Sequence, residues 1–213
     1  QFRLLGMEKV LILGYGKEGR ATQKYLKRYY PQIKIGIAEI HGKKEIFRVV
    51  PRKFPCSSAN FNIAIKTPGI KKEFVTIPYT TATNIFFSQV LNRHTVIGVT
   101  GSKGKSTTAS IIYEILKTAG KKVELLGNIG KPMLESLLSN TQHLVPKIYV
   151  LELSSYQLDD IKFSPHIAVM TNLFEEHMDF HGSLRNYFNA KKNIIDQQKP
   201  NNHFVYNPKN KFM

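Results

Sequence analysis

Two glycine-rich stretches could each hold a phosphate chain, and the clearer one is GVTGSKGKST at residues 98–107. Backbone N–H groups in such a turn bind phosphate oxygens, a lysine ammonium offsets their charge, and a serine hydroxyl can ligate Mg²⁺. The spacing is shorter than in the common phosphate loop, because Val99 stands where that motif has its first glycine. A helix-capping turn without a ligand is the alternative. The stretch predicts a polyphosphate site made by Gly101, Ser102, Lys103, Gly104, Lys105, Ser106 and Thr107.

The second glycine-rich stretch follows the apolar run Val10–Leu13 and has its glycines at Gly14, Gly16 and Gly19. This G-x-G-x-x-G pattern, followed by a helix expected over 20–29, is typical of a turn that binds a nucleoside diphosphate. A strand expected over 33–39 ends at Glu39, where an acid commonly binds a ribose. The pattern does not say which nucleotide binds: NAD is one candidate, and a tight turn without a ligand is the alternative.

Acidic and imidazole side chains follow two further strands. Glu152 lies inside the apolar run 149–153, and a buried carboxylate needs a partner, either a metal ion or a basic side chain. The loop after a strand at 167–170 could hold a hard divalent cation, and a solvated acidic loop is the alternative. Its candidate ligands are Asn172, Glu175, Glu176, His177, Asp179 and His181.

A lysine interrupts the apolar face of the helix expected over 183–196. Ser183 is a plausible N-cap, and the spacing of the apolar side chains places Lys191 among them while Lys192 points to solvent. A buried lysine is costly, so Lys191 either extends its ammonium to the rim or works in a site.

Strands alternate with helices along the whole chain, which predicts an α/β fold with parallel sheets. The strand that begins at Ile63 ends in a turn at Thr67, Pro68 and Gly69, and ligands bind at such carboxyl ends. A strand at 95–100 and a helix at 106–119 flank the phosphate loop. We expect a Rossmann-like parallel-sheet domain at 1–92 and a second nucleotide-binding domain at 93–213.

The composition of the chain limits the classes of partner that it is expected to bind. The chain has 213 residues, 42% of them hydrophobic, one cysteine (Cys56) and a formal net charge of +16. The basic residues are scattered, which favours anionic small molecules over nucleic acid. No apolar run is long enough for a membrane span and no secretory signal is recognisable, so we expect a cytoplasmic protein without nucleic-acid or membrane partners.

The blocks TGSKGKST, GNIG (127–130), LELSSYQL and EEHMD together resemble those of the Mur ligase family, the ATP-dependent amide ligases of peptidoglycan assembly. The resemblance extends from about residue 7 to the end of the chain and is strongest from 98 to 191. It implies that the second domain is a partial, P-loop NTPase-like Mur ligase central domain, and that the C-terminal ligase domain is absent. The blocks look most like those of the member that joins D-glutamate to UDP-N-acetylmuramoyl-L-alanine.

The resemblance also implies a reaction and roles for residues. ATP would phosphorylate the carboxylate of the UDP-linked substrate, the amine of D-glutamate would attack the acyl phosphate, and Mg²⁺ would offset charge. Lys105, His177 and Lys191 would be catalytic, with Ser106, Glu152, His177 and Lys191 (as a carbamate) holding Mg²⁺. The substrate residues would be Gly14, Tyr15, Gly16, Lys17, Glu18, Glu39, Thr67, Pro68, Gly69, Asn128, Ser154 and Gln157. The last three would contact the muramoyl-alanine arm or order the loop near it.

Three departures from the family pattern limit this interpretation. Lys103 stands where a small polar residue is expected, the stretch 80–88 lacks expected acids, and family members are roughly twice as long. We therefore expect a monomeric fragment that is inactive alone, and we give residues 1–6 before Met7 no role. Other Mur-family or folylpolyglutamate-type ligases, an inactive nucleotide-binding remnant and an NAD-dependent dehydrogenase stay as alternatives.

Overall fold

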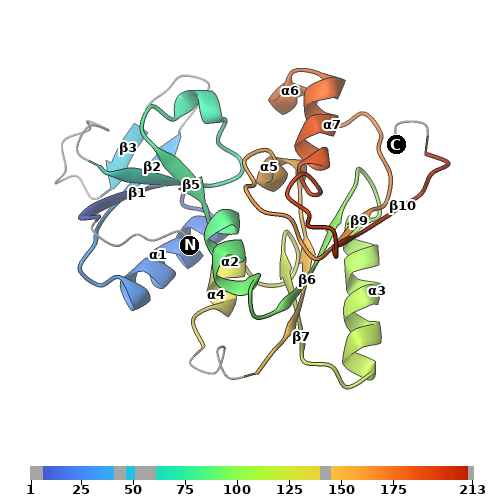
Figure 1. Cartoon of the computed structure of the whole chain (residues 1–213). Helices are drawn as coiled ribbons and strands as arrows, with labels where there is room; N and C mark the ends of the chain where they lie inside the picture. The colour runs from blue at the N-terminus through green and yellow to red at the C-terminus, as the bar shows by residue number, and fades with distance from the viewer. Residues whose placement is uncertain (1–6, 41–46, 51–60, 140–144, 211–213) are drawn as a thin grey trace. The chain divides into compact units, whose positions relative to one another are not determined.

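The chain folds into two compact units, each built on its own five-stranded sheet (Figure 1). The computed structural model describes residues 7–40, 47–50, 61–139 and 145–210. The first unit runs to Phe86 and includes Met133–Leu138, and the second contains Phe87–Pro132 and the residues from Ser139 onward. Cys56 lies outside the described residues.

The first unit has the strand order β3-β2-β1-β4-β5. Central β1 pairs in parallel with β2 and β4, β4 pairs in parallel with β5, and β3 is antiparallel to β2. The elements are β1 (Lys9–Leu13), α1 (Lys17–Tyr29), β2 (Lys34–Ile40), β3 (Phe47–Val50), β4 (Ile63–Lys66), η2 (Lys72–Phe74), β5 (Tyr79–Thr81) and α4 (Met133–Ser136). Helix α2 (Ala82–Val90) contains the boundary between the two units, which falls after Phe86.

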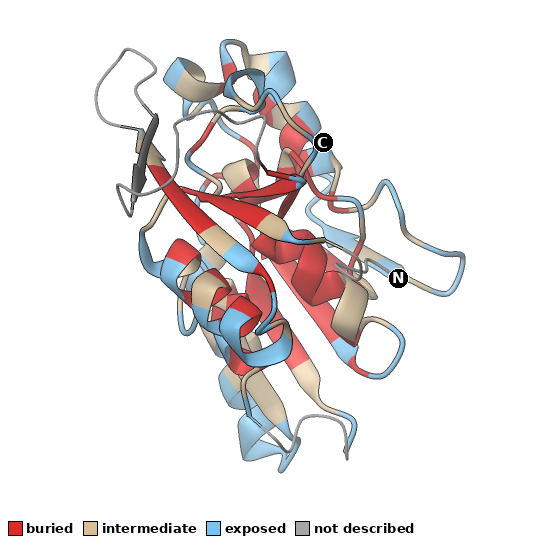
Figure 2. Cartoon of the chain, turned by 90° about the vertical axis from the view of Figure 1, so that its left-hand side faces the viewer, coloured by how far each residue is buried: buried red, intermediate tan, exposed pale blue. Residues whose placement is uncertain are grey.

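Side chains of β1 alternate between the two faces of this sheet, as the pleat requires. Leu11 and Leu13 join a buried cluster with Ala38, Phe61 and Ala64. Ile12 faces α1, because a Cβ on Gly19 of that helix would lie 3.5 Å from the Ile12 side chain. The sheet is therefore covered on both faces, which explains the continuous burial along β1 (Figure 2).

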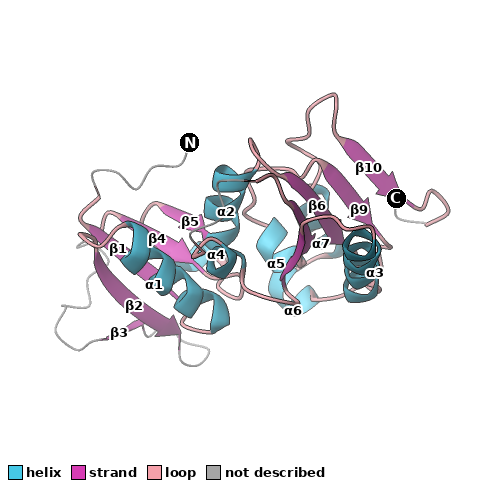
Figure 3. Cartoon of the chain, turned by 90° about the horizontal axis from the view of Figure 1, so that it is seen from below, coloured by secondary structure: helices cyan, strands magenta, loops and turns pink. Residues whose placement is uncertain are grey.

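The second unit has the strand order β10-β9-β6-β8-β7, and all of its strand pairs are parallel (Figure 3). The elements are β6 (Thr95–Thr100), α3 (Lys105–Thr118), β7 (Val123–Gly127), β8 (Ile148–Glu152), α5 (Ser155–Leu158), β9 (Ile167–Met170), α6 (Met178–His181), α7 (Leu184–Lys192) and β10 (His203–Tyr206).

Central β6 also alternates between two covered faces. Ile97 and Val99 pack in one cluster with Ala109 of α3. Gly98 faces the opposite side, where an added Cβ would approach Pro165, Leu153 and Ile194 at 2.9, 3.2 and 3.3 Å. The phosphate loop therefore starts from a strand that is held on both sides.

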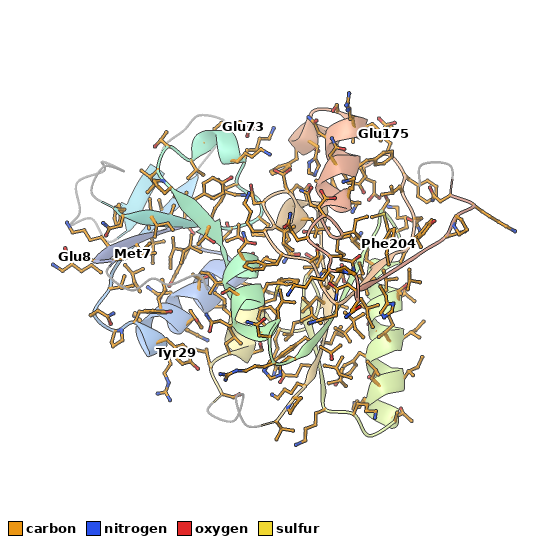
Figure 4. The ribbon with its side chains drawn as sticks, in the orientation of Figure 1. Met7, Glu8, Tyr29, Glu73, Glu175 and Phe204 are labelled. Carbon is orange, nitrogen blue, oxygen red and sulfur yellow. The ribbon has the colours of Figure 1, made fainter. Side chains whose placement is uncertain are left out.

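The predicted α/β fold with parallel sheets is confirmed, with local differences. Helix α1 begins at Lys17, before the expected residue 20, and α7 ends at Lys192, before the expected residue 196. Segment Met133–Leu138 joins the first unit although it lies within the stretch assigned to the second domain, because α4 packs on α1 and the Tyr29 hydroxyl donates to the Leu137 carbonyl (Figure 4). Among the described residues, no helix has the length and apolar character needed to span a membrane.

Candidate functional site

The phosphate loop connects the end of β6 to the first turn of α3. Gly101 has φ +142°, and an added Cβ would lie 2.0 Å from Thr171 Oγ1, so only glycine fits there. Gly104, at φ +80°, precedes the helix, whose first bond runs from Thr108 N–H to the Gly104 carbonyl at 3.0 Å. The N–H groups of the residues before Thr108 have no carbonyl partner within the helix, which makes this helix start a potential anion site.

The first N–H groups of the loop are not available to a phosphate. Ser102 N–H donates to the Asn172 carbonyl at 2.9 Å, and Lys103 N–H donates to Asn172 Oδ1 at 2.8 Å. The Asn172 amide returns a hydrogen bond to the Lys103 carbonyl at 3.1 Å. The anion nest expected directly after Gly101 therefore has fewer available N–H groups than the sequence indicates. Asn172, which the sequence suggested as a metal ligand, instead holds the loop.

The Ser102 hydroxyl also ties the loop to the segment after β9 and to α7. Ser102 Oγ donates to the Phe174 carbonyl at 2.9 Å and accepts from Phe174 N–H at 2.8 Å. It also lies 2.8 Å from the Tyr187 hydroxyl, and both side chains are buried. Ser102 is thus a residue that shapes the loop from inside.

Two lysine ammonium groups bind consecutive carbonyls of the loop. Lys105 Nζ donates to the Ser102 carbonyl and Lys191 Nζ to the Gly101 carbonyl, each at 2.7 Å. Lys191 is 1% exposed and its ammonium lies 4.8 Å from the centre of the Tyr187 ring. Burial and, to a smaller extent, the charge of nearby Lys105 lower the Lys191 pKa to about 7, although Glu176 opposes both effects. The predicted helix face is confirmed, since Lys191 is buried and Lys192 is exposed.

Glu152 is a buried carboxylate at the carboxyl end of β8, in register with Val99 of β6 and Gly127 of β7. It is 1% exposed, and its Oε1 accepts from the Asn128 side-chain amide at 3.1 Å. Its Oε2 is buried without a hydrogen-bond partner among the described residues. Because Mg²⁺ prefers such hard anionic oxygens, this carboxylate fits a magnesium ion.

His177 has an unusual backbone. At φ 58° it is the sole non-glycine residue with positive φ in the part of the chain that the structure describes. Such strain clusters at functional sites. Its ring lies 5.0 Å from Tyr156 and 6.2 Å from Tyr187, between centroids. His181 is buried and bonds Ser155 Oγ at 3.0 Å, so it has a structural role.

No group of three or more His, Cys, Asp or Glu side chains that could hold a metal occurs within the described ranges. Mg²⁺ commonly takes one or two protein ligands and completes its shell with water and substrate phosphates. The residues therefore fit a metal that arrives with a nucleotide rather than an all-protein metal cage.

In the first unit, the structure brings together the two turns predicted to bind a nucleotide. Thr67 N–H donates to the Leu13 carbonyl at 2.9 Å, and a Cβ on Gly14 would lie 2.1 Å from Thr67 Oγ1. A Cβ on Gly19 would lie 2.1 Å from the Gly14 carbonyl oxygen, whereas one on Gly16 would meet nothing within 4 Å. Packing thus explains why positions 14 and 19 require glycine, whereas the open space at Gly16 suits a ligand that approaches the backbone closely.

The other residues predicted to bind the UDP part lie in α1, in β2 or in the two turns. The Tyr15 hydroxyl donates to Gln23 at 2.6 Å, and Glu39 at the end of β2 is opposite Arg48 of β3. Lys17 and Gly69 are exposed, while Glu18 and Pro68 are half-buried.

The sequence interpretation missed Lys66, which is 1% exposed and donates to the Ile70 carbonyl at 2.7 Å. This bond closes the turn that contains Thr67. A lysine inside the apolar run IAIK was the available signal.

Ser154 and Gln157 form hydrogen bonds with each other at the start of α5. Gln157 N–H donates to Ser154 Oγ at 3.3 Å and Ser154 N–H donates to Gln157 Oε1 at 3.0 Å, which is a capping box. These two residues order the turn after Glu152, and Asn128 is exposed beside that carboxylate.

One mainly parallel sheet that carries a glycine turn and one wholly parallel sheet that carries a lysine-bearing phosphate loop define a nucleotide-binding α/β protein. Residues 99–213 match the Mur ligase middle domain. That match covers more than half of the chain, and the chain belongs to the Mur ligase family.

Three relatives with similar sequences share one name. The chain is 35% identical over 211 residues to a UDP-N-acetylmuramoylalanine--D-glutamate ligase of Oenococcus oeni, covering 94% of this chain and 46% of that protein. Proteins of the same name from Streptococcus thermophilus and Symbiobacterium thermophilum are 32% and 39% identical, over 94% and 70% of this chain and 48% and 33% of their own length. The chain thus spans about half the length of relatives that match nearly all of it.

Solved structures support the fold. The UDP-N-acetylmuramate:L-alanyl-gamma-D-glutamyl-meso-diaminopimelate ligase of Neisseria meningitides aligns with a TM-score of 0.56 at 18% identity, covering 97% of this chain and 73% of that one. A murein peptide ligase of Psychrobacter arcticus aligns with a TM-score of 0.51 at 16% identity, over 97% and 50% of the two chains.

Proposed function

We propose that this chain is the nucleotide-binding part of a cytoplasmic ligase that uses ATP to join D-glutamate to UDP-N-acetylmuramoyl-L-alanine, through an acyl phosphate. The relatives at 32–39% identity carry the name of that enzyme. The observation that carries the proposal is that the phosphate loop, the buried carboxylate of Glu152 and Lys191 all belong to the stretch that matches the family. The protein acts as a monomer, without membrane or nucleic-acid partners.

ATP binds at the phosphate loop, with its phosphates against the first turn of α3. The N–H groups of Lys105, Ser106 and Thr107 are directed out of the helix start and favour an anion. Lys105, which bonds the Ser102 carbonyl, exchanges that partner for the β- and γ-phosphates. The pair of glycines with positive φ on either side of Ser102 lets the backbone approach the ligand closely.

Mg²⁺, when bound, supplies positive charge against the transferring phosphoryl oxygens. Ser106 and Glu152 would hold one ion, and Glu152 suits this role because its buried Oε2 has no partner among the described residues. His177 would hold a second ion. Asn128 fixes the Glu152 carboxylate by donating to its other oxygen.

Lys191 would serve as a metal ligand after reaction with CO₂. In that reaction the neutral amine adds to CO₂ and releases a proton, which leaves a carbamate anion with two oxygens. Burial lowers the Lys191 pKa to about 7 and so supplies neutral amine near neutral pH. The ammonium now donates to the Gly101 carbonyl, and carbamylation would replace that contact.

The glycine turn of the first unit binds the UDP part of the substrate. The contact between Gly14 and Thr67 supports one site formed by Gly14–Glu18 and Thr67–Gly69, with Glu39 at the nucleoside end. The open space at Gly16 leaves room for a diphosphate against the α1 N-terminus.

The proposal is tested by titrating ATP and UDP-N-acetylmuramoyl-L-alanine into the protein and into Lys105→Ala. We expect Lys105→Ala to lose ATP binding and to keep UDP-substrate binding, because the two nucleotides occupy separate glycine turns. Equal loss of both ligands would contradict two separate sites. Displacement of the UDP ligand by NADH at comparable concentration would favour a dehydrogenase instead.

A further inference from the structure

The phosphate loop of this chain carries an additional cation that already has an anionic partner. Lys103 Nζ lies 2.5 Å from Glu176 Oε1, so the ion pair connects the loop to the residue before His177. The Lys103 side chain is 74% exposed and that of Glu176 is 20% exposed. Asn172 binds both the N–H and the carbonyl of Lys103, so the position from which this side chain extends is fixed.

Glu176 is surrounded by the cationic groups that the phosphate site is built from. Partial burial raises the pKa of Glu176, but the hydrogen bond and charge of Lys103, together with the charges of Lys105 and His177, outweigh burial and lower that pKa. Glu176 in turn favours the charged form of Lys191. A carboxylate among these groups makes the interactions that a phosphate oxygen would make.

We propose that Glu176 is a built-in substitute for phosphate: it holds Lys103 while the site is empty, and an incoming polyphosphate displaces it and takes Lys103 as a second cation beside Lys105. The inference rests on the proposed ATP site and deepens it, because it names what the nucleotide must displace. Lys103 then makes the loop selective: its ion pair with Glu176 breaks when a polyphosphate binds and persists in the presence of a weaker anion.

Simple electrostatics supports this exchange. The Lys103 side chain is 74% exposed, so water screens this ion pair on one side and the pair contributes only modestly to stability. A triphosphate carries several charges and acceptor oxygens where Glu176 offers one charge, and charge-assisted bonds to phosphate are strong. Glu176 also interacts with the Tyr187 hydroxyl, and its side chain is 20% exposed, so the released carboxylate can keep this second contact or turn toward solvent.

The test measures binding of inorganic tripolyphosphate and of ATP by calorimetry, with EDTA present so that no metal contributes. The variant Glu176→Gln keeps the shape of the side chain and removes its charge. Glu175→Gln is the matched control, because Glu175 is exposed on the same loop and loses the same charge (Figure 4). We expect Glu176→Gln to bind both probes about twofold to fivefold more tightly, and Glu175→Gln to change affinity less.

A second comparison shows whether Lys103 mediates the effect. We expect Lys103→Gln to weaken binding of both probes, and Glu176→Gln to give a smaller gain in that background than alone. Equal gains in both backgrounds, or equal effects of Glu175→Gln and Glu176→Gln, would overturn the inference while leaving the ATP site intact. If neither the protein nor Glu176→Gln bound either probe, the proposed function and the inference would both be wrong.

Discussion

At the scale of single residues, the glycines of the turn in the first unit have different roles, some in packing and one in ligand binding. The sequence shows three glycines at the right spacing but cannot show what each one faces. In the structure, Gly14 has φ +85° and no room for a Cβ, while Gly16 has negative φ and open space. Two alanine substitutions within one motif should therefore have different consequences.

We expect Gly14→Ala to destabilise the first unit by about 2 kcal/mol or more, because the Cβ would overlap Thr67 and the backbone would be strained. Gly16→Ala should leave the free energy of unfolding within about 0.5 kcal/mol and weaken binding of the UDP ligand. Denaturant unfolding and ligand titration of the two variants decide this. Normal UDP binding by a folded Gly16→Ala variant would show that no ligand approaches there.

The lowered pKa of Lys191 implies that the free energy of unfolding depends on pH. Its pKa is about 7 in the folded protein against an ordinary value of 10.5. Between these values the unfolded chain holds a proton that the folded chain has lost, so raising the pH through this window favours folding. In CO₂-free buffer, we expect the protein to gain on the order of 1–3 kcal/mol relative to Lys191→Met from pH 7 to 10.

The control for this measurement is Lys192→Met, which changes the exposed neighbour and should show no comparable gain. The sequence predicted which of the two lysines is buried, because helical periodicity sets the face. It could not predict the Gly101 carbonyl as the partner, because that residue is 90 positions away in the chain.

At the scale of elements, the phosphate loop takes its shape from a second segment, Thr171–Glu176. Local signals predicted β6, α3 and the turn between them, since strand, glycines and helix are adjacent in sequence. The hydrogen bonds that fix the loop come from the residues after β9, which neither periodicity nor turn chemistry reveals. The sequence therefore indicates candidate residues for the site, but it does not reveal the hydrogen bonds that hold the loop in place.

We expect Asn172→Ala to lower ATP affinity about tenfold and stability by about 1–3 kcal/mol, because the Lys103 N–H loses its partner and the Lys103 carbonyl keeps only the Thr171 hydroxyl. Asn193→Ala is a matched control: its amide also donates to a backbone carbonyl, that of Leu158 at 3.0 Å, but does not contact the loop. Both variants should lose stability, and only Asn172→Ala should lose affinity. Unchanged ATP binding in Asn172→Ala would contradict a positioning role.

At the scale of the whole molecule, the chain consists of two units with their own sheets and cores. The alternation of strands and helices predicted this α/β class. It did not predict that Met133–Leu138 joins the first unit, because that depends on packing between α4 and α1. Each unit carries one glycine turn, and the two nucleotides are assigned to different units.

Hydrogen exchange should show this division. We expect ATP with Mg²⁺ to slow amide exchange at residues 101–109 and to leave residues 14–22 unchanged, and a UDP ligand to do the reverse. Ligand binding stabilises the segments that it contacts against local opening. Slowed exchange in both segments with either ligand would show that the two units respond together.

The hydrogen bonds between Lys103 and Asn172 have a consequence for synthesis of the protein. These residues are 69 positions apart, so the loop leaves the ribosome several seconds before its partner at ordinary rates of translation. During that interval the nascent chain contains the glycine motif without the contacts that shape it. ATP should therefore assist folding less before Asn172 has emerged, and products of translation that end before β9 should compete only weakly with the finished protein for nucleotide.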